Sequence, residues 1–460
     1  MKTKTGVRLF GLFDCSIGCL AGLSALLVAG CRNYEARPID WESEAAAWKG
    51  ETNVVRLASC EDAALVARIG NPEVNELRLK SANAKNVARE TGWWDDPEFE
   101  MDLNRIVQSS QHPFLMGSSL TFAIPLSGAP KLDERAAEGY AEADALAVRV
   151  AEADLAAEAG AAYHRLASAR TREAALRAFT QDPKLAQARE TAARLAESGE
   201  VKAAEVSAVR RRQHDRLHGL REAERETDAA RADLRKILGL APGVRLEVVA
   251  ETEADDAEVR EAYDAATNAP PAVAFARHLR VRERLVRLGA SEAAFEAEIR
   301  RQYPDLKIGP GFSHEEGQGR VGIVLGTTVP LWNRNRKAVV ESEGKRDEDR
   351  LAAIQTWRTL VQEAAAARTR LVRMLDHPPS ELPQEAELEK LLEAGELDTL
   401  GYLSVREELL DAQLAELDWT RDLRQAVEEM KRFRLPVTRR HGATERVRET
   451  EAPARLGDLE

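Results

Sequence analysis

Long helical seams dominate the pattern of apolar and polar positions along the chain. Over residues 206–237, apolar or small residues recur at steps built from three and four, and Gly239 follows the last of them. A second seam covers 405–433, and a third, made mostly of small residues, covers 132–150. This spacing places the residues along one face of a helix. It predicts helices longer than those of an ordinary globular domain, packed together as an extended bundle.

Four shorter stretches alternate between apolar and polar or small residues with a period of two. They cover about residues 98–104, 117–125, 305–313 and 320–330. Such alternation predicts strands with one apolar face, and each stretch is close to the roughly ten residues that a tilted membrane strand requires. The polar segment 314–320 is expected to form an exposed hairpin loop. A small soluble β-domain is the alternative interpretation of these strands.

The N-terminal segment is typical of a bacterial secretory signal. Positively charged residues precede a largely apolar stretch over 9–28, and the small residues Ala29 and Gly30 then lead to Cys31. A cysteine at this position resembles a lipobox, which predicts a lipoprotein signal peptide over 1–30 and acylation of Cys31. An ordinary signal peptide with an incidental cysteine is the alternative. In either case the mature chain is expected outside the cytoplasm.

Composition narrows the classes of function. Charged residues make up 31% of the chain and aromatic residues 5%, which is typical of long helices that pack through small side chains. The net charge of −12 argues against a nucleic-acid partner. Two of the four cysteines leave with the signal and Cys31 takes the lipid, so no intrachain disulfide is expected. Cys60 is interpreted as a small buried apolar residue.

The order of these elements occurs twice along the chain. Pro125 and Pro330 each stand where a strand pair gives way to a long helix. Farther on, Gly199 and Gly395 each follow an apolar helical run and are each followed by glutamate. The sequence of helix, two strands, helix, glycine turn and helix therefore recurs, which predicts two internal structural repeats.

Taken in this order, the chain resembles the TolC family of outer-membrane efflux channel subunits over residues 54–433. The resemblance rests on the two proline-bearing strand-to-helix junctions, on the segment 330–336 with the sequence PLWNRNR, on the two glycine turns and on the lipobox. It implies a mainly α fold with a small β part. Long antiparallel helices would form a trimeric periplasmic α-barrel, and each subunit would contribute four strands to a 12-stranded outer-membrane β-barrel.

The resemblance also divides the chain into successive parts. These are a signal peptide (1–30), a lipid-anchored N-terminal linker (31–56), a first repeat (57–246), a second repeat (247–434) and a C-terminal tail (435–460) whose composition predicts disorder. The implied partners of the homotrimer are a periplasmic adaptor protein, an inner-membrane pump and outer-membrane lipid. Arg32 is not the aspartate that commonly retains lipoproteins in the inner membrane. This favours the outer membrane of a Gram-negative bacterium, with most of the chain in the periplasm.

Several residues acquire roles from the resemblance. The helix turns would dock the adaptor through the tip residues Arg194, Gly199, Glu200, Lys390, Gly395 and Glu396. Glu98, Glu100 and Asp102 alternate on the face of the first strand that would line the pore, where carboxylates favour cations. Simple wetting of a wide channel is the alternative reading of these acids. Well-studied family members carry gating acidic residues near the second tip, where this chain has Gly401 and Ser404 instead.

The sequence predicts no enzyme, no cofactor and no bound metal. His214 and His218 stand four residues apart on one helical face, as zinc ligands do in some hydrolases. The residue after His214 is aspartate rather than the glutamate of that motif, and the neighbouring arginines would repel a cation. A solvated helix face is therefore the better interpretation.

The predicted function is a passive exit duct of a tripartite efflux system, which exports small toxic solutes delivered by an inner-membrane pump and a periplasmic adaptor. Heavy-metal cations are one candidate cargo, because residues 333–336 resemble a junction common in the heavy-metal branch of the family. Drug efflux and type I secretion are alternatives within the family. The alternative from another functional class is a periplasmic scaffold or adaptor lipoprotein, made of coiled coils and without a barrel. The duplicated strand pairs argue against this alternative.

Overall fold

The structure is a computed structural model. It describes residues 34–50, 53–105, 107, 114–249, 256–268, 270–315, 318–379 and 398–435. The predicted signal peptide, Cys31, the second tip (Lys390, Gly395 and Glu396) and the tail beyond residue 435 lie outside the described residues. The chain divides into a unit that ends at Thr52 and a unit that begins at Asn53.

The described part of the first unit holds one short helix, α2 (Trp41–Gly50). Asp40 precedes it, and its Oδ1 accepts hydrogen bonds from the backbone N–H groups of Glu42 and Ser43 at 3.2 and 3.3 Å. An aspartate in this position satisfies N–H groups that have no partner within the helix. This local capping explains why a helix begins inside the segment predicted as a linker.

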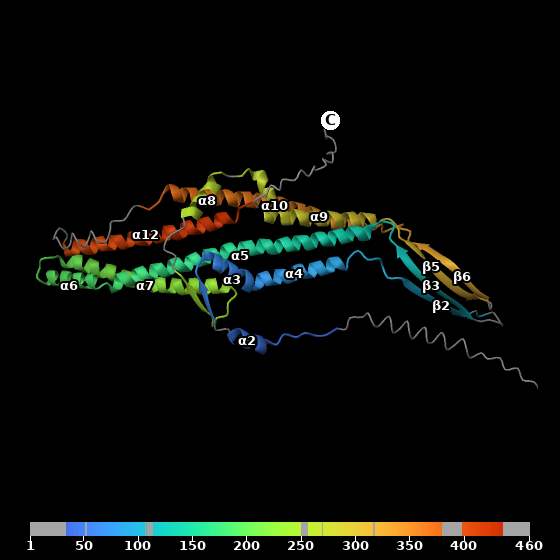
Figure 1. Cartoon of the computed structure of the whole chain (residues 1–460), viewed down its shortest axis with the longest axis horizontal. Coiled ribbons are helices and arrows are strands. Elements are labelled where there is room, and N and C mark those ends of the chain that lie inside the picture. Colours follow the sequence, from blue (N-terminus) through green and yellow to red (C-terminus); the bar gives the residue numbers. More distant parts are fainter. Residues whose placement is uncertain are drawn as a thin grey trace, which may run out of the picture. The chain divides into compact units, whose positions relative to one another are not determined.

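Helices make up most of the second unit (Figure 1). Its helical elements are α3 (Cys60–Gly70), α4 (Pro72–Arg89), α5 (Ala129–Gln181), α6 (Pro183–Glu197), α7 (Ala203–Ile237), α8 (Asp256–Thr267), η1 (Ala272–Arg277), α9 (Leu279–Arg300), α10 (Arg336–Asp376) and α12 (Thr399–Lys431). Helix α5, with 53 residues, packs against α3, α4, α7, α9 and α12. The predicted seams fall in α5, α7 and largely in α12. None of the described helices is both long and apolar enough to cross a membrane.

Small residues let neighbouring helices approach α5 closely. A Cβ atom added at Gly139 would lie 2.8 Å from the Cβ of Ala290 in α9, so the two backbones leave no room for a side chain there. Helix α5 ends before Pro183, because proline has no N–H to continue the helical hydrogen bonds. Asp182 then caps α6, and its Oδ1 accepts a hydrogen bond from Lys184 N at 2.8 Å.

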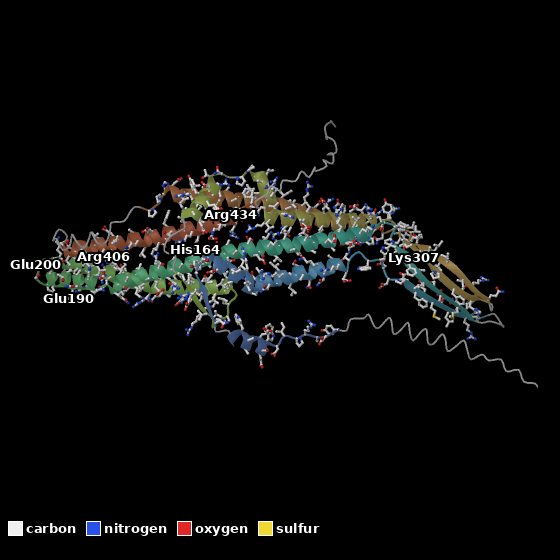
Figure 2. All side chains as sticks on the ribbon, in the orientation of Figure 1. His164, Glu190, Glu200, Lys307, Arg406 and Arg434 are labelled. Carbon is white, nitrogen blue, oxygen red and sulfur yellow. The ribbon has the colours of Figure 1, made fainter. Side chains whose placement is uncertain are left out.

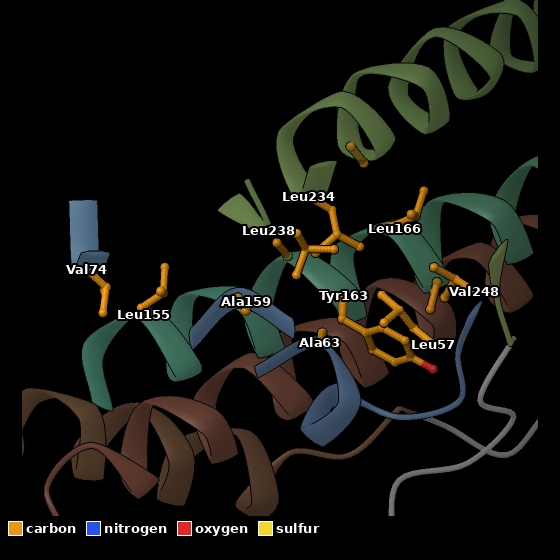
Figure 3. Close-up of a cluster of buried hydrophobic side chains, with 14 residues drawn as sticks. Leu57, Ala63, Val74, Leu155, Ala159, Tyr163, Leu166, Leu234, Leu238 and Val248 are labelled. Carbon is orange, nitrogen blue, oxygen red and sulfur yellow. The ribbon is translucent and has the colours of Figure 1, made fainter. Parts of the chain in front are cut away.

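Clusters of buried apolar side chains hold the described helices together. One cluster joins α3, α5 and α7 to a short parallel pair, β1 (Val54–Leu57) and β4 (Arg245–Val248), and Figure 3 shows Tyr163 within it. The Tyr163 hydroxyl lies 3.1 Å from the carbonyl oxygen of Ala58 and 3.0 Å from that of Val249, so its polar end keeps a partner when buried. Further clusters join α8, α9 and α10 to α12, and α5, α6 and α7 to α12.

A four-stranded antiparallel sheet lies at one end of the helices (Figure 1). Its strands follow the order β2 (Glu98–Arg105), β3 (Phe114–Ile124), β5 (Leu306–Glu315) and β6 (Gln318–Thr327). All four alternating stretches of the sequence therefore contribute a strand. Strand β3 ends immediately before Pro125, and β6 ends at Thr327, three residues before Pro330.

The hairpin between β5 and β6 is tighter than the sequence predicts. The polar segment 314–320 predicts a loop, but the ladder continues through the pairs His314 with Gly319 and Glu315 with Gln318. The prediction of a seven-residue loop is therefore wrong. Backbone pairing extends both strands past the polar residues, because each residue added to the ladder satisfies N–H and C=O groups that otherwise depend on water.

Candidate functional site

The four-stranded sheet has one apolar face and one polar face. Neighbouring residues of a strand point to opposite sides, so the register places most large apolar residues of the four strands on one side, while Leu115 and Val324 lie on the other. These residues are Phe99, Met101, Leu103, Leu120, Phe122, Ile124, Leu306, Ile308, Phe312, Val321, Ile323 and Leu325. Ile323 is 75% exposed and Leu325 is 67% exposed. An exposed apolar surface of this extent marks contact with lipid or with another protein.

Glu98, Glu100 and Asp102 lie together on the opposite face of the sheet. Strand β3 presents small side chains across from them, and all three acids are exposed. Lys307 of β5 reaches over β3, and its Nζ lies 2.6 Å from Oε2 of Glu98. Sequence reasoning missed this lysine because it stands 209 positions from its partner. The polar face therefore combines the three predicted carboxylates with a cation.

The outer edges of the sheet have no partner among the described residues. Strand β2 pairs with β3 alone and β6 pairs with β5 alone. An open edge presents a row of N–H and C=O groups that need water or another strand. Strands β2 and β6 are therefore the edge strands of the described sheet.

Pro125 and Pro330 meet where the sheet gives way to the helices. Both line a cleft of about 940 Å³, and so do Trp93, Trp94 and Trp332. The three tryptophans are exposed at the same end of the sheet. The two junctions that the sequence places 205 positions apart thus form one surface, with an aromatic rim.

The segment 330–336 has an unusual backbone. Arg334 and Asn335 have φ angles of 45° and 54°, conformations that side chains other than glycine rarely adopt. Asn335 is held by its Nδ2, which donates to the backbone oxygen of Glu298 at 2.9 Å and to the Oε2 of the same residue at 2.7 Å. This anchor fixes the direction in which α10 leaves the sheet.

The turn between α6 and α7 is an exposed end of the helices. Gly199 has a φ of 82°, and a Cβ added to it would meet nothing within 4 Å, so the backbone rather than packing demands glycine. Arg194 pairs with Glu190 at 2.5 Å, and both side chains are exposed. Figure 2 shows Glu190 and Glu200 at the helical end of the second unit, opposite to Lys307 in the sheet. The first predicted tip is therefore a solvent-facing turn.

Charged pairs join α12 to the helices beside this turn. Arg406 Nη2 lies 2.9 Å from Asp182 Oδ2, and both side chains are largely buried. Arg216 of α7 reaches Glu407 and Asp411 of α12, each at 2.7 Å. Sequence reasoning missed these contacts, because the partners of Arg406 and Arg216 stand 224 and 191 or more positions away.

His214 and His218 lie on the exposed face of α7. Nδ1 of His218 stands 3.4 Å from Oε1 of Glu222 in the next turn, while Arg216 between the two histidines turns toward α12. This arrangement is that of a solvated helix surface. The metal-ligating groups that cluster among the described residues lie elsewhere in the fold.

That cluster consists of Cys60, His164 and Glu428, from α3, α5 and α12. Cys60 Sγ lies 3.7 Å and His164 Nε2 lies 3.9 Å from the same Oε1 of Glu428, and Lys431 Nζ lies 2.6 Å from it. Burial by itself would raise the pKa of Glu428, but hydrogen bonding with His164 and Lys431 outweighs burial and lowers that pKa. Glu428 is therefore a carboxylate at neutral pH. Nothing in the sequence signals this cluster, since Cys60 and Glu428 stand 368 positions apart.

The fold is that of solved outer-membrane channels. A membrane protein from Pseudomonas aeruginosa matches with a TM-score of 0.63 at 17% identity, over 88% of this chain and 96% of that chain. CusC, whose structures concern transmembrane channel formation, matches with a TM-score of 0.62 at 13% identity, over 88% of this chain and 99% of that chain. The outer membrane channel CmeC of Campylobacter jejuni matches with a TM-score of 0.61 at 13% identity, over 88% and 90% of the two chains.

No protein-family profile and no curated protein matches the sequence. At the identities found, the solved structures establish the fold. CusC and CmeC belong to the TolC family of outer-membrane channels, and the expected mainly α fold with a small β part is confirmed. The trimer, the two barrels and the internal repeats stay predictions.

Proposed function

We propose that this chain is a TolC-family subunit of a trimeric exit duct in the outer membrane, part of a tripartite efflux system. The four-stranded sheet carries the proposal, because it combines an exposed apolar face with two open edges. Pairing of β6 in one copy with β2 in the next satisfies both edges, and three copies close a barrel of the implied size. A periplasmic scaffold without a barrel has no use for such a sheet.

In this arrangement the apolar face contacts lipid and the polar face lines the conduit. Glu98, Glu100 and Asp102 then ring the lumen, with Lys307 neutralising part of their charge. Trp93 lies at the boundary between lipid and water, where tryptophan is enriched in membrane proteins. The helices extend from the sheet into the periplasm, and acylated Cys31 adds a lipid anchor.

The duct is passive and performs no chemistry. Its cargo is a class of small toxic solutes that an inner-membrane pump and a periplasmic adaptor deliver. The acidic face supports cations, including heavy-metal cations, as one cargo class, and drug export is the second candidate. The adaptor docks on the helix turns, which in the described residues means Arg194, Gly199 and Glu200.

The test of the barrel is a pair of charge substitutions with a matched control. Phe122→Arg and Leu325→Arg each place a cation on the apolar face, which costs about 2–4 kcal/mol per subunit where the residue faces lipid near the midplane. We expect the yield of trimer in outer-membrane fractions, measured by native gel electrophoresis, to fall for both. Ser313→Arg introduces the same side chain on the polar face of the same sheet, and its yield should stay near the wild-type level. Normal trimer yields for both apolar-face variants would overturn the proposal.

A further inference from the structure

The cluster formed by Cys60, His164 and Glu428 lies far from both the sheet and the tip. Figure 2 places His164 between Glu200 at the helical end and Lys307 in the sheet, nearer to the helical end. The three ligand atoms lie within 4.8 Å of one another, and the side chains of His164 and Glu428 are only 7% and 9% exposed. An exit duct does not require a thiol, an imidazole and a carboxylate to converge in this place.

The spacing of these atoms matches a tetrahedral metal centre. Bonds of about 2.0–2.3 Å from Zn²⁺ to nitrogen, oxygen and sulfur set neighbouring ligand atoms roughly 3.3–3.8 Å apart. The Sγ of Cys60 and the Nε2 of His164 lie 3.7 and 3.9 Å from Oε1 of Glu428. All three atoms lie within 4.8 Å of one another, so they have to draw slightly closer together to surround one ion.

We propose that Cys60, His164 and Glu428 bind a divalent transition-metal ion, for which Zn²⁺ is the best match. A thiolate and a carboxylate balance the two positive charges, and sulfur with imidazole nitrogen selects Zn²⁺ over Mg²⁺ or Ca²⁺. The thiol of Cys60 gives its proton to solvent when the sulfur–metal bond forms. A cleft of about 550 Å³ that Cys60 and Glu428 line provides the path for the ion and a water molecule as fourth ligand.

Lys431 is the competitor for this site. Its ammonium group stands 2.6 Å from Oε1 of Glu428, where it supplies the positive charge that the ion would bring. Oε1 of Glu258 lies 3.2 Å from the same ammonium, so Lys431 has a second carboxylate to which it can turn when the ion enters. Other basic side chains line the same cleft. Arg280 and Arg432 pair with Asp154, and Arg434 pairs with Glu261. The remaining arginines of the cleft add positive charge that opposes the entry of a cation, and they are Arg68, Arg149, Arg277 and Arg282.

The ion would tie together three helices that belong to distant parts of the chain. Cys60 begins α3, His164 lies in α5 and Glu428 lies in the last turn of α12. This site is distinct from the conduit, and its occupant is held rather than exported. Metal bound to the folded state alone raises the unfolding midpoint as the metal concentration rises.

The test uses the purified full-length trimer in detergent, stripped of metal and titrated with Co²⁺ as the probe. We expect one Co²⁺ per chain, with a thiolate-to-cobalt charge-transfer band in the near ultraviolet, and displacement of Co²⁺ by Zn²⁺. Cys60→Ser should remove the band, and Glu428→Gln should weaken binding at least about tenfold. Lys431→Gln should strengthen binding several-fold, a result that a merely structural lysine would not produce. The double variant His214→Ala, His218→Ala on the surface of α7 should keep the wild-type titration.

The wild-type titration alone can overturn the proposal, so a variant that fails to fold does not obscure the outcome. Absence of the charge-transfer band in the wild type, or its survival in Cys60→Ser, would show that these residues do not bind metal. A weaker titration in folded Lys431→Gln would show that the lysine supports the site rather than competing for it. Trimer assembly is scored separately, so failure here leaves the exit-duct proposal standing.

Discussion

Among single residues, His278 connects the start of α9 to the end of α12. Its Nδ1 accepts a hydrogen bond from Arg280 N at 3.2 Å, and its Nε2 lies 3.0 Å from the carbonyl oxygen of Arg432. In the neutral ring Nε2 therefore carries the proton and donates to Arg432. Burial, aided by the charge of Arg280, lowers the pKa of His278 below its ordinary value of 6.5. The hydrogen bond to Arg432 and the charge of Asp154 oppose that shift.

Acid should weaken this connection. His278 has a lower pKa in the folded state than its ordinary value of 6.5 in the unfolded state. The stabilisation that His278 provides is therefore present above pH 6.5, and it is lost as the pH falls through the pKa of the folded state. A protonated Nδ1 cannot accept from Arg280 N, so a cap of about 1 kcal/mol disappears. Between about pH 7 and pH 5, the free energy of unfolding should fall more for the wild type than for His278→Asn, which keeps a capping acceptor and does not titrate. His214→Asn is the exposed control, and identical pH profiles for the wild type and His278→Asn would contradict the prediction.

Gly199 permits a prediction about docking. A tryptophan at this position adds bulk to an exposed turn and strains a positive φ without filling any core. It is combined with Gly395→Trp at the second predicted tip, which lies outside the described residues. We expect normal trimer yield but a loss of survival on the exported toxicant and of cross-linking to the adaptor. Wild-type survival and cross-linking would show that these turns are not the docking surface.

At the scale of elements, the attachment of α12 depends on buried charge as well as on apolar packing. Arg406→Leu leaves Asp182 without its cationic partner, and removing one member of a buried pair costs about 3–5 kcal/mol. The unfolding midpoint in detergent should fall, and adding Asp182→Asn, which keeps the cap of α6, should restore part of it. Lys80→Leu breaks an exposed pair with Glu76 and is the control. Equal effects of Arg406→Leu and Lys80→Leu would count against a buried ion pair.

Elements were easier to predict than contacts. The strands β2, β3, β5 and β6 follow from alternation, because each has an apolar side and a polar side and the period shows directly in the sequence. Helices α7 and α12 follow from their seams for the same reason. The length of the β5–β6 hairpin did not follow, since pairing of the backbone extended both strands past the polar residues.

The site residues also divide into those that share one element and those that come from different elements. Glu98, Glu100 and Asp102 share a face because they share a strand, so local spacing was enough to group them. Lys307 comes from another strand, and the partners in the cluster of Cys60 and Glu428 come from different helices. Such groupings depend on which helices and strands pack together, and spacing within one element carries no information about that.

For the whole molecule, the contributions of lipid anchor and sheet can be separated. Cys31→Ser should abolish acylation, but a trimer buries far more apolar surface in lipid than one anchor does. We therefore expect partial mislocalisation in cell fractionation, with trimers still present in the outer membrane. A variant found wholly in the soluble periplasmic fraction would favour the scaffold over the duct.

The length of helix α5 contributes to the distance between the sheet and the tip. Its 53 residues span roughly 80 Å at about 1.5 Å per residue, and close contacts fix it sideways at Gly139 against α9 and at Gly160 against Glu428 of α12. One residue inserted between these glycines would rotate everything beyond it by about 100° and turn one contact away from its partner. The reach from sheet to tip can therefore change only in steps of nearly whole turns, about 5.4 Å each, and only when neighbouring helices gain the same length.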